Sequence, residues 1–196
     1  MALERIISSG QAGVGRAALD AAIHNMVYDW GGWVQRGKLA EDGQIPDEYF
    51  NTTSVSRGLK ECDSSRPARR TALNIADSDA TMVLRFSGGG RVLSPGTKLT
   101  IKICRDKGKP YRIFDPSKVK SVPRAVQWIC DQKILDGDKE RGIKILNIAG
   151  PRESKSPGIY DRSLLYLKDV LGFVFTYNRW GVKIWSPHKP RKKVGL

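Results

Sequence analysis

The sequence is poor in the residues from which metal centres and histidine-based catalytic sites are usually built. It has two histidines, His24 and His188, and three cysteines, Cys62, Cys104 and Cys130, which are odd in number and lie far apart. No Cys-x-x-Cys pair and no Cys/His pair occurs at metal-ligand spacing. We therefore expect no metal site, no disulfide framework and no catalytic triad that depends on histidine.

Long apolar runs are also missing. No stretch approaches the roughly 18 consecutive apolar residues of a membrane-spanning helix, and the first five residues lack the order of basic and then apolar residues that marks a signal peptide. The 196 residues, 40% hydrophobic and 28% charged, have the composition of a globular domain. We expect a cytoplasmic protein with no membrane partner.

Acidic residues are too few to balance the basic ones. The chain has 34 Lys and Arg against 20 Asp and Glu, which gives a net charge of +14 at pH 7. A field of that sign raises the local concentration of anions. Phosphorylated metabolites, oxyanions and nucleic acids are therefore the expected classes of partner.

Apolar segments alternate along the chain in a pattern typical of a three-layer α/β domain. The sequence predicts strands at 5–8, 79–86, 110–114 and 142–150, and it predicts helices over 19–26, 95–104, 122–135 and 164–171. Residues 29–58 show no clear period, so we expect a long structured loop there. The alternation predicts a mostly parallel sheet with helices on both faces.

The domain is expected to span residues 1–176, followed by a C-terminal extension over 177–196. From Trp185 onward the extension is basic and interrupted by prolines. Such a composition is typical of a tail outside the core.

Three glycine-bearing turns follow predicted strands, at 10–13, 94–97 and 150–153. In parallel α/β sheets ligands bind at the carboxyl ends of the strands, where free N–H groups at helix starts attract phosphate. None of the turns matches the dinucleotide fingerprint or the P-loop, and each is as typical of plain chain reversal as of an anion site. The ligand-binding residues that we predict in these turns are Gly10, Gln11, Gly13, Gly96, Thr97 and Gly150.

Polar residues near these turns extend the candidate site. Arg16, in the first turn of a predicted helix, either reaches an anion at that helix start or is solvated, with Asp20 as a surface partner. Asn74 and Asp79 precede a predicted strand, where they are typical of a ligand contact or of a strand-entry turn. Arg152, after the strand at 142–150, allows the same two interpretations.

Five blocks of the sequence, in the same order, resemble the molybdenum carrier family of bacterial proteins. The blocks are residues 8–20, 31–33 with 37–46, 70–71 with 74 and 77–81, 96–100, and 146–154. That family belongs to the SLOG superfamily of Rossmann-like domains, which also includes lysine-decarboxylase-like proteins and the DNA-processing protein of natural transformation. The resemblance implies a Rossmann-like fold and a homodimer.

The resemblance also implies a ligand and a place for it. SLOG domains bind nucleotides and related phosphorylated small molecules, so a nucleotide or the molybdenum cofactor is the implied ligand. The implied pocket lies between the first glycine turn and the turn at Gly96 and Thr97. Gly32, Trp33 and Lys38 are expected above it, where an aromatic ring and a charge could hold the ligand.

The sequence departs from the family pattern at several positions. Ser9, Ala12 and Gly15 replace a glycine, a hydroxyl and a carboxylate, and Val34 replaces a cysteine. Thr100 stands where the cytokinin-activating phosphoribohydrolases of the superfamily carry their glutamate. Because a hydroxyl cannot replace a carboxylate in glycosidic cleavage, the pattern favours a non-catalytic binding protein.

Two other functions fit parts of the sequence. Tyr177, Trp180 and Trp185, followed by the basic tail, resemble a surface that stacks bases and neutralises phosphates in nucleic acids, although tryptophans at such spacing are also typical of core packing. Asp77, Asp79 and Glu153 offer carboxylates for hydrolysis of an N-glycosidic bond or a phosphate ester.

Overall fold

A single parallel sheet forms the centre of the protein. The computed structural model describes residues 3–50, 57–88 and 93–180, without the side chains of 177–180. The six strands pair in the order β5-β2-β1-β10-β6-β7, and each neighbouring pair is parallel. Their bounds are β1 Arg5–Ile7, β2 Asp29–Val34, β5 Gly58–Glu61, β6 Ala80–Leu84, β7 Tyr111–Phe114 and β10 Ile145–Ala149.

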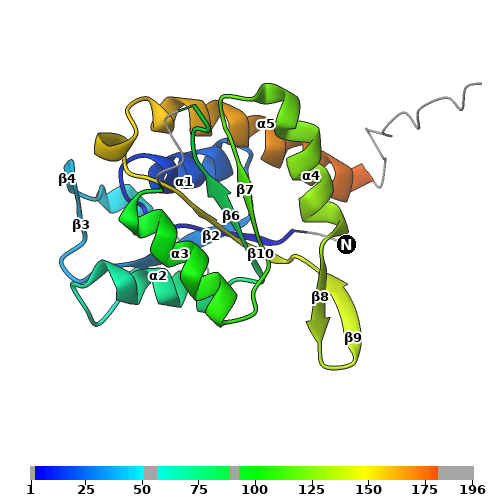
Figure 1. Cartoon of the computed structure of the whole chain (residues 1–196), viewed down its shortest axis with the longest axis horizontal. Coiled ribbons are helices and arrows are strands. Elements are labelled where there is room, and N and C mark those ends of the chain that lie inside the picture. Colours follow the sequence, from blue (N-terminus) through cyan, green and yellow to red (C-terminus); the bar gives the residue numbers. More distant parts are fainter. Residues whose placement is uncertain (1–2, 51–56, 89–92, 181–196) are drawn as a thin grey trace, which may run out of the picture.

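Helices cover both faces of this sheet (Figure 1). One face carries α1 (Val14–His24), α4 (Val122–Asp131) and α5 (Ile159–Trp180), and the other carries α2 (Pro67–Ala76) and α3 (Pro95–Asp106). The prediction of a three-layer α/β domain with a parallel sheet is confirmed. The basic tail from Trp185 lies outside the described residues.

Short elements connect these layers. Two antiparallel hairpins stand apart from the main sheet, β3 (Leu39–Ala40) with β4 (Gly43–Gln44), and β8 (Lys133–Asp136) with β9 (Lys139–Gly142). Single turns of 3₁₀ helix are η1 (Asp47–Tyr49), η2 (Val119–Ser121) and η3 (Glu153–Lys155). None of the described helices combines the length and the apolar character needed to cross a bilayer.

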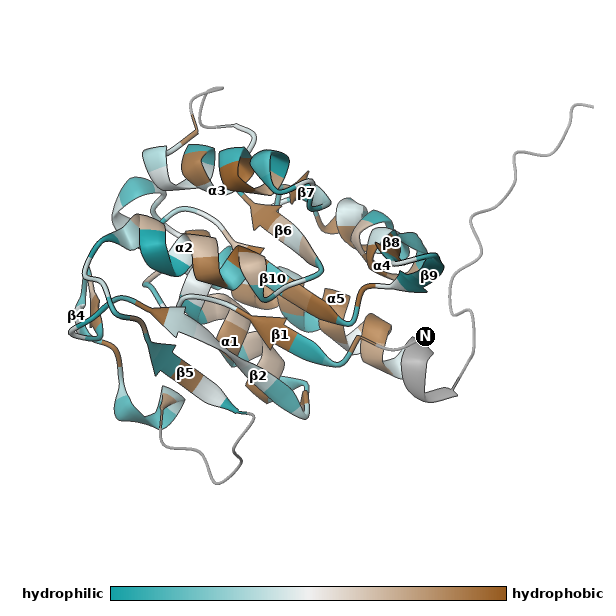
Figure 2. Ribbon diagram, turned by 90° about the horizontal axis from the view of Figure 1, so that it is seen from below, coloured by the Kyte–Doolittle hydropathy of each residue, from teal (hydrophilic) through white to brown (hydrophobic). Residues whose placement is uncertain are grey.

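The core lies between the central strands and the helices. Ile6, Met82, Leu146 and Ile148 of the central strands are essentially inaccessible to solvent, as is Leu167 of α5. Figure 2 shows the same pattern, with apolar central strands and more polar outer elements. Strands that are buried on both faces explain why these segments are continuous apolar runs.

The predicted loop over residues 29–58 is wrong in its first part, because residues 29–34 form β2 inside the sheet. Its sequence, Asp-Trp-Gly-Gly-Trp-Val, lacks the alternation of a half-exposed strand because tertiary contacts fix the glycines. A Cβ on Gly31 would lie 2.2 Å from the carbonyl oxygen of Gly58, and one on Gly32 would lie 2.0 Å from that of Ser8. The absence of side chains there allows the backbones to approach closely.

Two predicted helical stretches also differ from the structure. In α1 the buried face consists mainly of small residues such as Ala18 and Ala22, whereas Ile23 is 45% exposed and Met26, beyond the helix, is 89% exposed. The helix predicted over 122–135 ends at Asp131, and the following residues form the β8–β9 hairpin. The predicted helix was too long because the apolar residues keep a helical spacing beyond Asp131. This local spacing does not reveal a hairpin that is held by contacts with distant residues.

The order of the strands reverses between β1 and β10. The chain runs from β1 outward to β2 and β5, then crosses to β6 and β7 and returns to β10 beside β1. In open α/β sheets this reversal leaves a crevice at the carboxyl ends of the strands, where ligands bind. The two glycine turns that follow β1 and β10 lie at this edge.

Candidate functional site

A cavity of about 250 Å³ opens at this edge of the sheet. Its walls come from the turn after β1, the start of α2, the start of α3 and the turn after β10. The lining residues are Ser9, Gln11, Ala12, Gly15, Pro67, Arg70, Thr71, Asn74, Ser94, Pro95, Gly96, Leu99, Thr100, Asn147, Ile148, Ala149, Gly150, Pro151, Arg152 and Lys155.

The two glycine turns pack directly against each other. The N–H of Val14 donates to the carbonyl of Pro151 at 3.3 Å. A Cβ on Gly13 would lie 2.7 Å from that same oxygen, and one on Gly150 would lie 2.5 Å from Cγ2 of Val14. Both glycines are therefore required by the contact between the turns, whether or not a ligand is bound.

Helix starts contribute unpaired backbone donors to the cavity. Gly15 and Gly96 are the second residues of α1 and α3, so their N–H groups have no partner within the helix. The side chain of Ser94 caps α3 by accepting from the N–H of Thr97 at 3.2 Å. The first turns of α1, α2 and α3 contain no acidic residue, which leaves the positive ends of these helices without a counter-charge.

Arg70 is the most unusual side chain in the cavity. It is only 7% exposed, and in the described part of the chain its guanidinium forms no ion pair or hydrogen bond, with Nε buried and unsatisfied. Burial and the neighbouring charge of Arg152 lower the pKa of Arg70 to about 10, so it remains cationic at neutral pH. Burying an unpaired charge is costly, so a site that retains one favours an anionic ligand.

Arg70 was not among the predicted site residues, and neither was Lys155. The sequence feature that points to Arg70 is its spacing from Asn74. The two residues are four apart, so both side chains lie on one face of a helix that starts at Pro67. The sequence pattern alone did not indicate that this face turns toward the glycine turns.

The structure brings some of the predicted residues together at the cavity and places others nearby. Gln11, Asn74, Gly96, Gly150 and Arg152 line it. Asn74 also fixes α2 to β2, since its side chain accepts from the N–H of Trp33 at 2.7 Å and donates to the carbonyl of Trp33 at 3.0 Å. Gly32 packs against Asn74 Oδ1 and the backbone of Ser8, and Thr97 is buried behind the start of α3.

Other predicted residues hold the β3–β4 hairpin close to the cavity. Arg16 pairs with Asp42 at 2.6 Å and donates to the carbonyl of Gly10, so the predicted partner Asp20 is wrong. Gln11 donates to the carbonyl of Leu39 at 2.8 Å. These contacts fix the hairpin to the first glycine turn.

Trp33 and Lys38 do not line the cavity. The indole of Trp33 donates to Asp77 at 2.6 Å, and the ammonium of Lys38 lies 4.4 Å from the ring centre of Phe50. Both side chains therefore have partners of their own on the protein.

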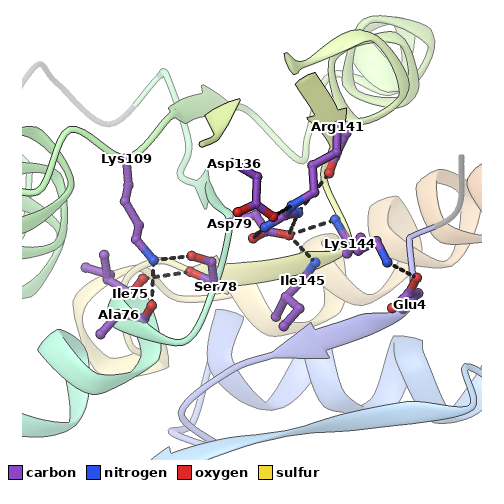
Figure 3. A network of polar contacts seen from close by, with 11 residues as sticks. Glu4, Ile75, Ala76, Ser78, Asp79, Lys109, Asp136, Arg141, Lys144 and Ile145 are labelled. Atoms are coloured by element: carbon purple, nitrogen blue, oxygen red, sulfur yellow. Dashed lines mark hydrogen bonds and ion pairs between the residues drawn. The ribbon is translucent and has the colours of Figure 1, made fainter. Parts of the chain in front are cut away.

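Asp79 lies directly before β6, at the amino-terminal ends of the strands and therefore on the side of the sheet away from the cavity (Figure 3). Its carboxylate accepts two bonds from Arg141, at 2.7 and 2.9 Å, and one each from the N–H groups of Lys144 and Ile145. Burial alone would raise the pKa of Asp79, but these hydrogen bonds lower it below its ordinary value. The contacts hold the β8–β9 hairpin to the sheet.

The comparisons with known proteins agree with this geometry. The family model of the circularly permutated YpsA SLOG family matches residues 6–171. The chain belongs to this SLOG family. No curated protein matches it.

A solved structure extends the SLOG assignment. A protein from Syntrophus aciditrophicus SB, described as a "putative molybdenum carrier protein" and solved at 1.45 Å, is 33% identical in sequence. The match covers 87% of this chain and 96% of that one, with a TM-score of 0.69. The predicted resemblance to molybdenum carriers of the SLOG superfamily is thus confirmed at the level of family and fold.

Proposed function

We propose that this SLOG protein binds a phosphorylated small molecule in the cavity at the carboxyl ends of β1 and β10. The observation that carries the proposal is the buried guanidinium of Arg70, which has no anionic partner in the described chain. A phosphate group would supply that partner through charge-assisted hydrogen bonds. Arg152 and Lys155, which line the same cavity, add two further cations.

The shape of the cavity supports a small ligand with an anionic end. Its volume of about 250 Å³ is at or below the lower end of the range of about 300–1,000 Å³ typical of ligand pockets. The free N–H groups of Gly15 and Gly96 offer donors to phosphate oxygens, while Ile148 and Leu99 offer apolar walls. A nucleoside monophosphate or a cofactor of similar size matches this arrangement.

The molybdenum cofactor is one candidate, since it carries a terminal phosphate and a solved relative is described as a molybdenum carrier. Arg70 and the helix starts fit the phosphate end. The cavity lining includes no Cys, His, Asp or Glu, and the described residues contain no group of three or more such side chains that could hold a metal. The protein would therefore hold such a cofactor through its phosphate and organic part.

Binding without catalysis is favoured by the positions of the carboxylates. Asp77 bonds to Trp33, Asp79 lies at the other sheet edge, and Glu153 accepts from the N–H groups of Gly158 and Tyr160. Thr100, at the position of the superfamily glutamate, donates to the carbonyl of Gly96 at 3.0 Å. The nucleic-acid alternative depends on the basic surface and on residues 177–196, and it stays a prediction.

Calorimetric titration with adenosine 5′-monophosphate, inorganic phosphate and molybdate tests the proposal. Arg70→Gln should abolish binding, whereas Arg69→Gln, which removes the exposed neighbour paired with Asp63, should leave it unchanged. Molybdenum and phosphorus content of the protein purified from its own cells would identify the natural ligand. Equal binding by the two variants would overturn the proposal.

A further inference from the structure

A second hollow adjoins the first at the same edge of the sheet. It lies beyond the carboxyl end of β6, between the start of α3 and the start of α5, with a volume of about 610 Å³. Ser94, Pro151 and Lys155 line both spaces, so only the start of α3 and the turn after β10 separate them. The two spaces are therefore direct neighbours.

The second hollow is lined by cations without partners. Arg85 follows β6, Arg162 lies in the first turn of α5, and Lys155 lies between the two spaces. Among the described residues, none of these three side chains forms an ion pair or a hydrogen bond. Arginines elsewhere in the fold pair with carboxylates where they hold a hairpin, such as Arg16 with Asp42 and Arg141 with Asp79.

Carboxylates are kept out of the second hollow. No Asp or Glu of the described residues lines it, and the nearby Asp115 accepts hydrogen bonds from the N–H and hydroxyl groups of Ser87 and Ser117. Burial alone would raise the pKa of Asp115, but these hydrogen bonds lower it to about 2. The carboxylate of Asp115 is therefore already hydrogen-bonded within its own loop. It does not pair with the cations of the hollow, which face solvent.

We propose that the ligand carries two anionic groups, one bound by Arg70 and Arg152 and the other by Arg85 and Arg162, with Lys155 between them. This inference rests on the proposed function, because the first group occupies the Arg70 cavity. It narrows the ligand class to a bis-phosphorylated or otherwise doubly anionic small molecule. A single phosphate would leave the Arg85 side of the site unused.

Inorganic phosphate and tripolyphosphate test the inference without assuming an organic scaffold. Affinities would be measured by calorimetry at a constant ionic strength of about 0.15 M, where long-range attraction is screened. Tripolyphosphate should bind about tenfold more tightly than phosphate, or better, because it gains charge-assisted bonds in the second hollow. The double variant Arg85→Gln/Arg162→Gln should lose this gain and keep the affinity for phosphate.

A matched variant removes two other arginines beside a hollow. Arg112→Gln/Arg124→Gln changes the net charge equally at the shallow hollow between β7 and α4. It should keep the preference for tripolyphosphate. An equal loss in both double variants, or a wild-type protein that binds the two anions equally, would overturn the second subsite and leave the first. Failure of both anions to bind the wild-type protein would overturn the proposed function as well.

Discussion

Arg69 and Arg70 are neighbours in α2 with opposite environments. The guanidinium of Arg69 is half exposed and pairs with Asp63 at 3.0 Å, whereas that of Arg70 is buried and lacks any partner in the described chain. One residue step, about 100° around the helix axis, thus separates a solvated ion pair from an unpaired buried charge. This contrast allows the ligand site to be tested by stability as well as by binding.

Arg70→Met should stabilise the unliganded protein while abolishing binding. The methionine keeps much of the apolar stem and removes the uncompensated charge, so the free energy of unfolding should rise by about 1 kcal/mol. Urea unfolding in a phosphate-free buffer measures it. A structural role for Arg70 requires the opposite sign, and Arg69→Met should change little because exposed pairs contribute little.

Gly15→Asp should weaken anion binding. A carboxylate at this position would enter the cavity lining at the start of α1, where it opposes a bound phosphate. We expect a loss of about tenfold or more in phosphate affinity. Gly15→Asn adds the same bulk beside Ser9 Oγ, 3.2 Å from the new Cβ, without the charge. Equal affinities of the two variants would contradict an anion at this helix start.

Gly32→Ala should unfold most of the protein. The new Cβ would lie 2.0 Å from the carbonyl oxygen of Ser8, at a φ of +136° that side chains rarely adopt. We expect a loss of about 4 kcal/mol or more in the free energy of unfolding. Gly96→Ala has no atom within 4 Å of its Cβ and should stay within about 1 kcal/mol of the wild type. Denaturant titration of both variants measures the contrast.

Acid should weaken the attachment of the β8–β9 hairpin. Because the pKa of Asp79 is lower in the folded protein than its ordinary value, the unfolded chain takes up the proton first. The stabilisation is therefore present above about pH 4 and lost as the pH falls through the folded pKa.

Asp79→Asn tests this relation. It should cost about 2 kcal/mol at pH 7 and flatten the fall in stability below about pH 4. Asp136→Asn removes the more exposed partner of the same Arg141, so it should have a small effect. Unfolding free energies that depend on pH equally in Asp79→Asn and the wild type would contradict the role of this carboxylate.

The sequence by itself determined eight of the α/β elements and their order, namely β1, α1, β6, α3, β7, α4, β10 and α5, and it missed β2, β5 and α2. The apolar runs of β1, β6 and β10 follow from burial on both faces, and the turn after β1 needs glycine because Gly10 and Gly13 have left-handed φ angles of +62° and +92°. The resemblance to the SLOG family likewise implied a pocket between the first glycine turn and the turn at Gly96 and Thr97, where the proposed ligand site lies.

Only the tertiary structure decided which side chains are free to act there. Asp79 opens a predicted strand and Arg70 lies in α2, a helix that the sequence pattern did not predict. Asp79 is neutralised by Arg141, 62 residues away, whereas Arg70 has no acidic partner among the described residues. The strand β2 was not predicted for the same reason. Its glycines are required because the carbonyl groups of Ser8 and Gly58, from other segments, leave no room for a Cβ. Contacts between distant segments decide whether a charge or a glycine serves packing or remains available to a ligand, and local sequence patterns do not specify those contacts.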